Sequence, residues 1–270
     1  MNNNDSPDVL RINRRQALEM LGGSMAALML TGCGSGSSSS ANATSSSGSS
    51  TSSASSSTTT STSSSCAVTP EGEIGPYFAD DSATGFNRST ILSNISGTET
   101  QTGVPFTLVI YVVDTEKDCA AVSGAQIDIW HCNASGVYSD IAAENTSSES
   151  WLRGYQITDS AGMVTFNTII PGWYSGRTTH IHLRVRSSYS EASSTSDGTN
   201  TTQVFFPQTL INTLSTSVAP YDAEGTNPTT NASDRVYTTQ TMGEAELTLS
   251  GDNTNGYVAT YTIGLPITTT

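Results

Sequence analysis

Short runs of β-branched and aromatic residues recur from residue 66 to the carboxyl end of the chain, and turn residues separate them. Runs of this kind predict β-strands, because such side chains pack well on a pleated surface. No part of this region shows sustained helical periodicity, so we predict an all-β fold, an antiparallel β-sandwich. The predicted strands span residues 106–113, 125–130, 152–158, 164–169, 180–186, 201–206, 246–249 and 257–263. Asp159 to Gly162 predicts a hairpin connection between two of these strands.

The chain divides into three segments of different composition. We assign residues 1–33 to a signal peptide, residues 34–65 to a flexible linker and residues 66–270 to a single domain. The linker consists almost entirely of Ser, Thr, Gly and Ala, and such a segment buries too little apolar surface to offset its ordering entropy. The domain, in contrast, is long enough to build a sizeable core.

The amino-terminal segment has the features of an export signal. Arg14 and Arg15 precede an apolar stretch that is too short, and too broken by glycine, for an ordinary membrane-spanning helix. The arginine pair matches the twin-arginine (Tat) signal in part. Residues 30–33, Leu-Thr-Gly-Cys, resemble a bacterial lipobox, so we expect Cys33 to be acylated and to anchor the protein to a lipid membrane. The alternative is a plain cleaved signal in which Cys33 is incidental. In either case we expect export, with the protein lipid-anchored on the extracytoplasmic side of a bacterial membrane or secreted.

The net charge of the chain limits the classes of molecule that it is expected to bind. Ten Lys and Arg residues stand against 24 Asp and Glu residues, which gives a net charge of −14. Binding to nucleic acid requires clustered basic residues, so we expect no nucleic-acid partner.

Three cysteines remain in the domain: Cys66, Cys119 and Cys132. An exported protein meets an oxidising compartment, where disulfides persist. Cys119 and Cys132 flank one predicted strand, and its length makes a bond between them improbable. We therefore expect Cys66 to pair with one of the two, and one thiol to stay free.

Candidate chemistry lies on the predicted strand of residues 180–186, His-Ile-His-Leu-Arg-Val-Arg. Alternation along a strand places His180 and His182 on one face, so that both imidazoles can reach one metal ion. The alternative to a metal site is that the two histidines lie on a solvated sheet face or form a packed polar pair. The only other histidine is His131, and no Cys-x-x-Cys pair exists, so a zinc site has too few ligands. Tyr138 and Tyr174 are available oxygen donors, and imidazole with phenolate suits ferric iron.

Four blocks of sequence resemble the intradiol ring-cleavage dioxygenases, the family of the catechol and protocatechuate dioxygenases. They occur in the family's order at residues 69–78, 128–138, 153–159 and 171–182. The resemblance implies a mononuclear non-haem Fe(III) ion held by Tyr138, Tyr174, His180 and His182. It also implies that O₂ cleaves a small aromatic diol between its two oxygenated carbons, which gives a cis,cis-muconate-type product.

The resemblance assigns further roles in the site. Arg177 would stabilise the carbanionic substrate, and Tyr174 would leave the iron and accept a substrate proton. Gln203, Pro76 and Tyr77 would contact the substrate. Without the resemblance, Arg177 would be a surface charge or salt bridge, Gln203 a solvent-facing residue, and Pro76 and Tyr77 a turn and a core aromatic. His131 receives no ligand role, and we interpret it as structural.

Catechol dioxygenases also carry a helical amino-terminal dimerisation region, which residues 34–65 cannot supply, so we expect no helical dimerisation domain. Two other classes of function remain open. One is a non-catalytic extracellular β-sandwich module that binds carbohydrate or an aromatic polymer, and the other is a surface protein that keeps a metal only for stability. The sequence leaves open which catechol derivative is used and what the oligomeric state is.

Overall fold

The computed structural model describes residues 66–79, 84–186, 200–241 and 243–267. The predicted signal peptide, its arginine pair, Cys33 and the linker all lie outside the described residues. No helix in the described part of the chain is long and apolar enough to cross a membrane.

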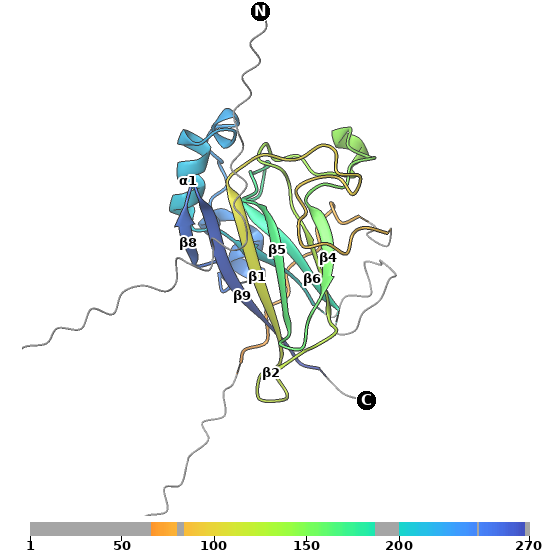
Figure 1. Cartoon of the computed structure of the whole chain (residues 1–270). Coiled ribbons are helices and arrows are strands. Elements are labelled where there is room, and N and C mark those ends of the chain that lie inside the picture. Colours follow the sequence, from red (N-terminus) through yellow and green to blue (C-terminus); the bar gives the residue numbers. More distant parts are fainter. Residues whose placement is uncertain (1–65, 80–83, 187–199, 242, 268–270) are drawn as a thin grey trace, which may run out of the picture. The chain divides into compact units, whose positions relative to one another are not determined.

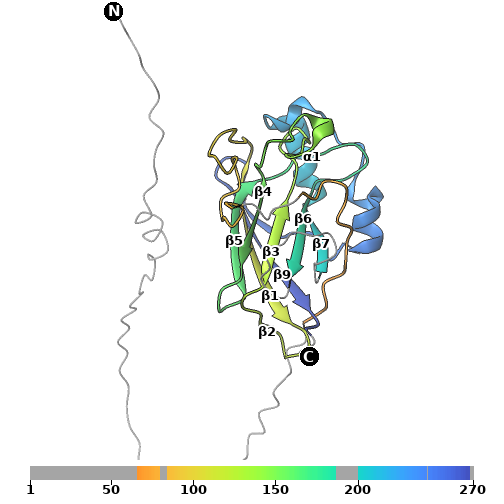
Figure 2. The same ribbon diagram turned by 90° about the vertical axis from the view of Figure 1, so that its right-hand side faces the viewer.

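Two β-sheets form the described domain (Figure 1). The five-stranded sheet has the order β2-β1-β9-β8, and β5 also pairs with β1. The four-stranded sheet has the order β4-β3-β6-β7, and Figure 2 brings it to the front. The strands are β1 (Pro105–Asp114), β2 (Ala120–Ala121), β3 (Gln126–Trp130), β4 (Arg153–Ile157), β5 (Met163–Ile169), β6 (His180–Arg186), β7 (Asn200–Phe205), β8 (Leu249–Asp252) and β9 (Gly256–Leu265). The predicted all-β sandwich is confirmed.

Apolar side chains on the facing sides of the two sheets form the main core. Strand β1 alternates strictly, and its buried positions include Leu108 and Ile110, which are fully inaccessible to solvent. Strand β6 contributes Ile181, Leu183 and Val185 to the same cluster. These residues account for the stability of the sandwich, and they leave the histidines of β6 on its outer face.

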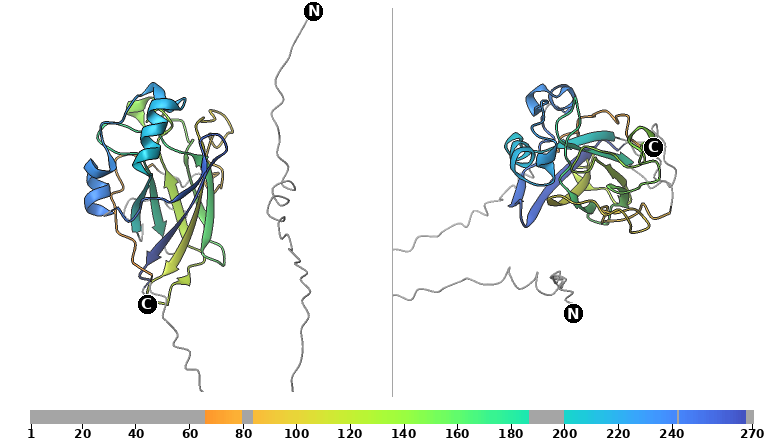
Figure 3. Two further views of the ribbon diagram at one scale, coloured as in Figure 1. Left: turned by 90° about the vertical axis from the view of Figure 1, so that its left-hand side faces the viewer. Right: turned by 90° about the horizontal axis from the view of Figure 1, so that it is seen from above.

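Most helical segments, α1 among them, gather at the end of the sandwich away from β2, whereas the blue turn η5 lies at its side (Figure 3). They are η2 (Ala142–Glu144), α1 (Gln208–Ser217), η3 (Tyr221–Ala223), η4 (Asn231–Ser233) and the π-helical turn η5 (Val236–Gln240). The expectation that the domain lacks helical periodicity is wrong at α1. Its buried residues include Ile211 and Leu214, one turn apart, which pack against the core. The pattern is short and lies among Ser, Thr and Asn, so it is weak in the sequence.

Three details of the predicted sheets require correction. Strands β1 and β9 pair in parallel, so the five-stranded sheet is mixed. The turn from Asp159 to Gly162 is not a hairpin connection, because β4 and β5 belong to different sheets. The strand expected at residues 246–249 begins only at Leu249 and ends at Asp252.

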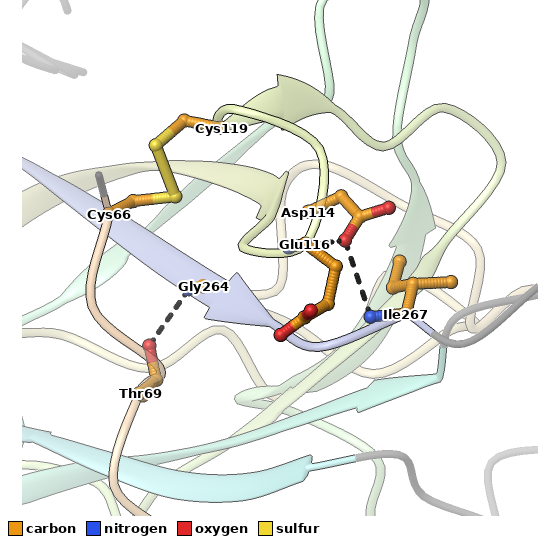
Figure 4. Close-up of a disulfide and its surroundings, with 7 residues drawn as sticks. All are labelled: Cys66, Thr69, Asp114, Glu116, Cys119, Gly264 and Ile267. Carbon is orange, nitrogen blue, oxygen red and sulfur yellow. Dashed lines mark hydrogen bonds between the residues drawn. A yellow bond between two sulfur atoms is a disulfide. The ribbon is translucent and has the colours of Figure 1, made fainter. Parts of the chain in front are cut away.

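Residues 66–79, which we call the strap, cross the outer side of the four-stranded sheet. Cys66 forms a disulfide with Cys119 (Figure 4). The Thr69 amide donates to the Gly264 carbonyl of β9 at 2.9 Å, and the Gly72 amide donates to the Thr201 carbonyl of β7 at 2.8 Å. The prediction that Cys66 pairs with one of the other two cysteines is confirmed, and Cys132 is the buried free thiol.

Candidate active site

Strand β6 places both predicted histidine ligands on the outer face of the four-stranded sheet. This face is not solvated, because all seven residues of β6 are buried. Around Trp130 and Tyr138, the strap residues Ile74, Tyr77 and Phe78 form a second, smaller apolar cluster. The interpretation of this face as a solvated sheet face is therefore wrong, whereas a packed polar pair agrees with the burial of both histidines.

The imidazoles of the two histidines converge. Their Nε2 atoms lie 3.1 Å apart, and the Tyr174 hydroxyl lies 3.3 Å from His180 Nε2. His180 Nδ1 is 2.6 Å from the Thr178 carbonyl oxygen, which can only accept a hydrogen bond. Nδ1 therefore carries the proton, and the lone pair of Nε2 points toward His182 and Tyr174.

Tyr138 completes the group from the opposite side. It is fully buried, and its hydroxyl has no hydrogen-bond partner among the residues that the structure describes. Its ring lies 5.7 Å from the Tyr174 ring, edge to face. A backbone contact brings the two tyrosine loops together: a Cβ at Gly136, where φ is +81°, would lie 2.1 Å from the Trp173 carbonyl oxygen. Only glycine permits that approach.

Burial holds all four groups in their neutral forms. It lowers the pKa of His180 to about 3 and lowers the pKa of His182 well below its usual range. Burial also raises the pKa of the Tyr138 and Tyr174 hydroxyls above their ordinary value. The imidazoles are thus free of competing protons, whereas the phenols need a nearby positive charge to ionise.

These four residues fit a ferric ion. Two imidazole nitrogens bound to one ion at about 2.1 Å are about 3.0 Å apart for a right angle and about 3.4 Å for a tetrahedral angle, a range that includes the observed separation. The buried, unpartnered Tyr138 hydroxyl is the kind of group that a metal satisfies. Among the described residues no three His, Cys, Asp or Glu side chains come together to hold a metal. A metal centre here therefore depends on the tyrosine oxygens, which are hard donors suited to ferric iron.

Arg177 lies at the edge of this group and is only 14% exposed. Its Nε donates to Asp234 Oδ2 at 2.8 Å, and its Nη2 donates to Gln203 Oε1. Gln203 is fully buried, pairs with His182 across the sheet, and donates through Nε2 to the Glu73 carbonyl at 2.8 Å. The interpretation of Gln203 as solvent-facing is wrong. Arg177 does form a salt bridge, as its simpler interpretation supposed, but with a partner buried beside the site.

The strap supplies the remaining predicted residues. Tyr77 stacks on Tyr138 with ring centroids 4.3 Å apart, and its ring edge lies against Tyr174 at 5.4 Å. Pro76 is exposed in the turn just before it. Gly75 lies against His182, because a Cβ there would be 3.1 Å from His182 Cε1. All eight predicted site residues therefore belong to one neighbourhood.

His131 and Cys132 are accounted for without a role in this group. His131 Nδ1 donates to the Cys132 carbonyl at 2.8 Å, and its Nε2 lies 2.7 Å from the Thr168 hydroxyl. Burial lowers the pKa of His131 to about 4 and raises the pKa of the Cys132 thiol to about 12. A neutral, fully hydrogen-bonded histidine agrees with the structural interpretation.

Sequence reasoning missed two residues of this site. Trp130 stacks on His182 at 4.8 Å with nearly parallel rings and fixes the plane of that imidazole. The sequence signal was its place in the matching block of residues 128–138, directly before His131. Its pairing with His182 across β3 and β6 is visible only in the structure. Asp234 lies in a loop with no pattern that would have marked it.

Comparisons with known proteins agree with this geometry. A family model described as Dioxygenase matches residues 74–208, half of the 270-residue chain. A catechol 1,2-dioxygenase from Candida albicans is 30% identical over 135 residues, which is 43% of this chain and 42% of that protein. Catechol 1,2-dioxygenase 1 from Acinetobacter lwoffii is 36% identical over 67 residues, 25% of this chain and 22% of that protein. The chain thus spans less than half the length of the curated relatives it matches.

Solved structures share the fold. An intradiol ring-cleavage dioxygenase from Tetranychus urticae superposes with a TM-score of 0.63 at 24% identity and covers 76% of this chain and 98% of its own. The dioxygenase domain of a carbohydrate-binding fusion protein from Streptomyces sp. SirexAA-E gives 0.52 at 25% identity, with coverage of 75% and 100%. The chain belongs to the intradiol ring-cleavage dioxygenase family.

Proposed function

We propose that this protein is an exported intradiol dioxygenase that uses a mononuclear non-haem Fe(III) ion and O₂ to cleave small catechol-type diols to cis,cis-muconate-type products. The observation that carries the proposal is that two neutral imidazoles converge, with the Tyr174 hydroxyl 3.3 Å from His180 Nε2 and the buried Tyr138 ring beside Tyr174. Tyr138, Tyr174, His180 and His182 would hold the iron. When bound, ferric iron supplies positive charge and Lewis acidity that activates a catechol ring toward oxygen.

The protein's own residues would prepare the substrate for this chemistry. The Tyr174 phenolate would accept a proton from a catechol hydroxyl, since it is the less buried of the two tyrosines. Arg177 would face negative charge that develops on the ring, because its guanidinium is held in place rather than free in solvent. Pro76 and Tyr77 would border the entry, and the apolar cluster under the strap would keep water away from the histidines.

The test begins with the purified protein loaded with ferric iron. Phenolate bound to ferric iron gives a visible charge-transfer colour. We expect that colour, about one iron per chain, and oxygen uptake with at least one member of a panel of catechols. His180→Ala and His182→Ala should lose iron and colour and keep the circular dichroism of a folded β-protein. His131→Gln is the matched control, because it changes the third histidine of the chain and should keep iron.

Tyr174→Phe separates the two tyrosine roles. We expect this variant to keep iron and to bind a catechol, but to turn over about 100-fold more slowly for want of its proton acceptor. A wild-type protein that is colourless and consumes no oxygen with any catechol would favour the non-catalytic binding module. A coloured protein without turnover would favour a metal held only for stability.

A further inference from the structure

One buried carboxylate outside the predicted ligand set lies next to the site. Asp234 is 1% exposed, and its Oδ2 accepts hydrogen bonds from Arg177 Nε and from the Thr178 amide, each at 2.8 Å. Its Oδ1 accepts two more, from the Tyr237 amide at 3.0 Å and from Arg177 Nη2 at 3.5 Å. A carboxylate with four donors on two oxygens is fixed in position, and so are the groups that donate to it.

The same carboxylate is two hydrogen bonds away from a histidine of the site. The Thr178 amide donates to Asp234, and the Thr178 carbonyl accepts the proton of His180 Nδ1. Asn231 reinforces this residue, because its Oδ1 accepts the Thr178 hydroxyl at 2.7 Å. Asn227 Nδ2 donates to the Arg177 carbonyl at 2.9 Å. Residues 227–234, which follow α1, therefore hold Arg177 and Thr178, just before β6, through hydrogen bonds to both their main-chain and their side-chain atoms.

Charge explains why this position requires a carboxylate. The Arg177 guanidinium is largely buried, and a buried cation without its counter-ion is strongly unfavourable. Glu73, at 4.0 Å from Arg177 Nη1, is a weaker counter-ion than Asp234, because it is more exposed and also pairs with Arg235. With its Nε bound to Asp234, the guanidinium directs Nη2 to Gln203. Without Asp234, the guanidinium would keep only its bond to Gln203 and the long contact to Glu73, and its Nε would lose its partner.

We propose that Asp234 is a positioning residue that orients the Arg177 guanidinium toward the substrate and, through Thr178, steadies His180. This inference rests on the proposed function, which gives Arg177 the role of facing the negative charge on the substrate ring. Misplacing such a group by about 1 Å is expected to reduce turnover by about 100-fold.

The test compares Asp234→Asn with Asp222→Asn in the full-length, iron-loaded protein. Asp222 is exposed on η3, and in the described part of the chain its side chain has no hydrogen bond or ion pair with a site residue, so it controls for loss of a carboxylate. We expect Asp234→Asn to lower kcat by about 10- to 100-fold, with KM changed less. We also expect it to shift the charge-transfer maximum of the resting ferric protein, which a purely structural role would leave unchanged. Asp222→Asn should match wild type in all three measurements.

A second pair of variants keeps the inference testable if Asp234→Asn folds poorly. Arg177→Gln combined with Asp234→Asn replaces the buried ion pair with neutral amides and removes the unpaired cation. Because part of the effect of Asp234 passes through Arg177, the fold-loss of kcat in the double variant should be clearly smaller than the product of the two single losses. Additive losses would overturn the inference, as would a wild-type kcat and spectrum in Asp234→Asn. A wild-type protein with neither colour nor oxygen uptake would overturn the proposed function as well.

Discussion

Gly75→Ala tests whether the strap presses directly on His182, a proposed metal ligand. Gly75 has φ of +71°, and a Cβ added there would lie 3.1 Å from His182 Cε1. This contact is too close, so the ring or the strap must move by a few tenths of an ångström. The ring has little freedom to move away, because its face is stacked on Trp130. Cε1 is bonded to Nε2, so a displaced ring carries the nitrogen proposed to bind iron with it.

Two effects contribute to the expected result, and a second glycine separates them. Alanine in the left-handed region costs roughly 1–2 kcal/mol wherever it occurs. Gly97 has φ of +84° and nothing within 4 Å of its added Cβ, so Gly97→Ala has the strain without the contact. For a domain of this size, roughly 1–2 kcal/mol corresponds to a fall in Tm of about 2–8 °C in either variant. Only Gly75→Ala should also weaken iron binding, by about 10- to 100-fold, as displaced supports of a metal ligand do.

The assay is iron content and visible absorption during titration with a ferric chelator, with thermal melts recorded in parallel. Gly97→Ala should melt lower than wild type and release iron at the wild-type chelator concentration. Gly75→Ala should release iron at a lower concentration. If both variants lose similar Tm and hold iron equally well, the strap does not constrain His182, and the reasoning is refuted.

Two further predictions concern stability. Cys119→Ser opens a disulfide that joins residues 53 apart and should lower the free energy of unfolding by roughly 4 kcal/mol, as measured by urea denaturation. Cys66→Ser should cost the same and the double variant no more, whereas a further loss in the double variant would show that the thiols act separately. Buried His131 stays neutral down to a pKa of about 4, whereas the unfolded chain takes up that proton near pH 6.5. Its contribution to stability is therefore complete above pH 6.5, falls by at most about 1.4 kcal/mol per pH unit down to pH 4, and is constant below. His131→Gln should flatten the pH dependence of unfolding in that window, and an unchanged slope would contradict the assignment.

Local patterns predicted much of this site. The period-two alternation of β6 places His180 and His182 on one face, and this can be predicted from the residues of the strand itself. The two tyrosines are different, since their loops meet through close backbone contacts, at Gly136 with Trp173 and at Gly172 with Ala134. The residues alone marked Tyr138 and Tyr174 as available oxygen donors, and the family resemblance assigned them as iron ligands.

Long-range features were not predictable in the same way. Alternation marks β1 and β9 as strands but does not specify that they pair in parallel, from Phe106 with Tyr257 onward. The hydrogen bond between Asp234 and Arg177 joins residues 57 apart, and nothing around Asp234 marks it as different from other acidic residues. Such residues become visible only when the fold brings their partners to them.

The four-stranded sheet is buried on both faces, but for different reasons. Its inner face is covered by the opposing sheet, whereas its outer face near the histidines is covered by the strap. The strap is too short to form a core of its own, and it depends on the disulfide at Cys66 and on backbone hydrogen bonds to β9 and β7. Release of the strap would admit water to His182 and Tyr138 and reduce the burial that keeps the imidazoles unprotonated. The covalent bond at one end of the strap and the proposed iron site at its other end are therefore linked through the same few residues.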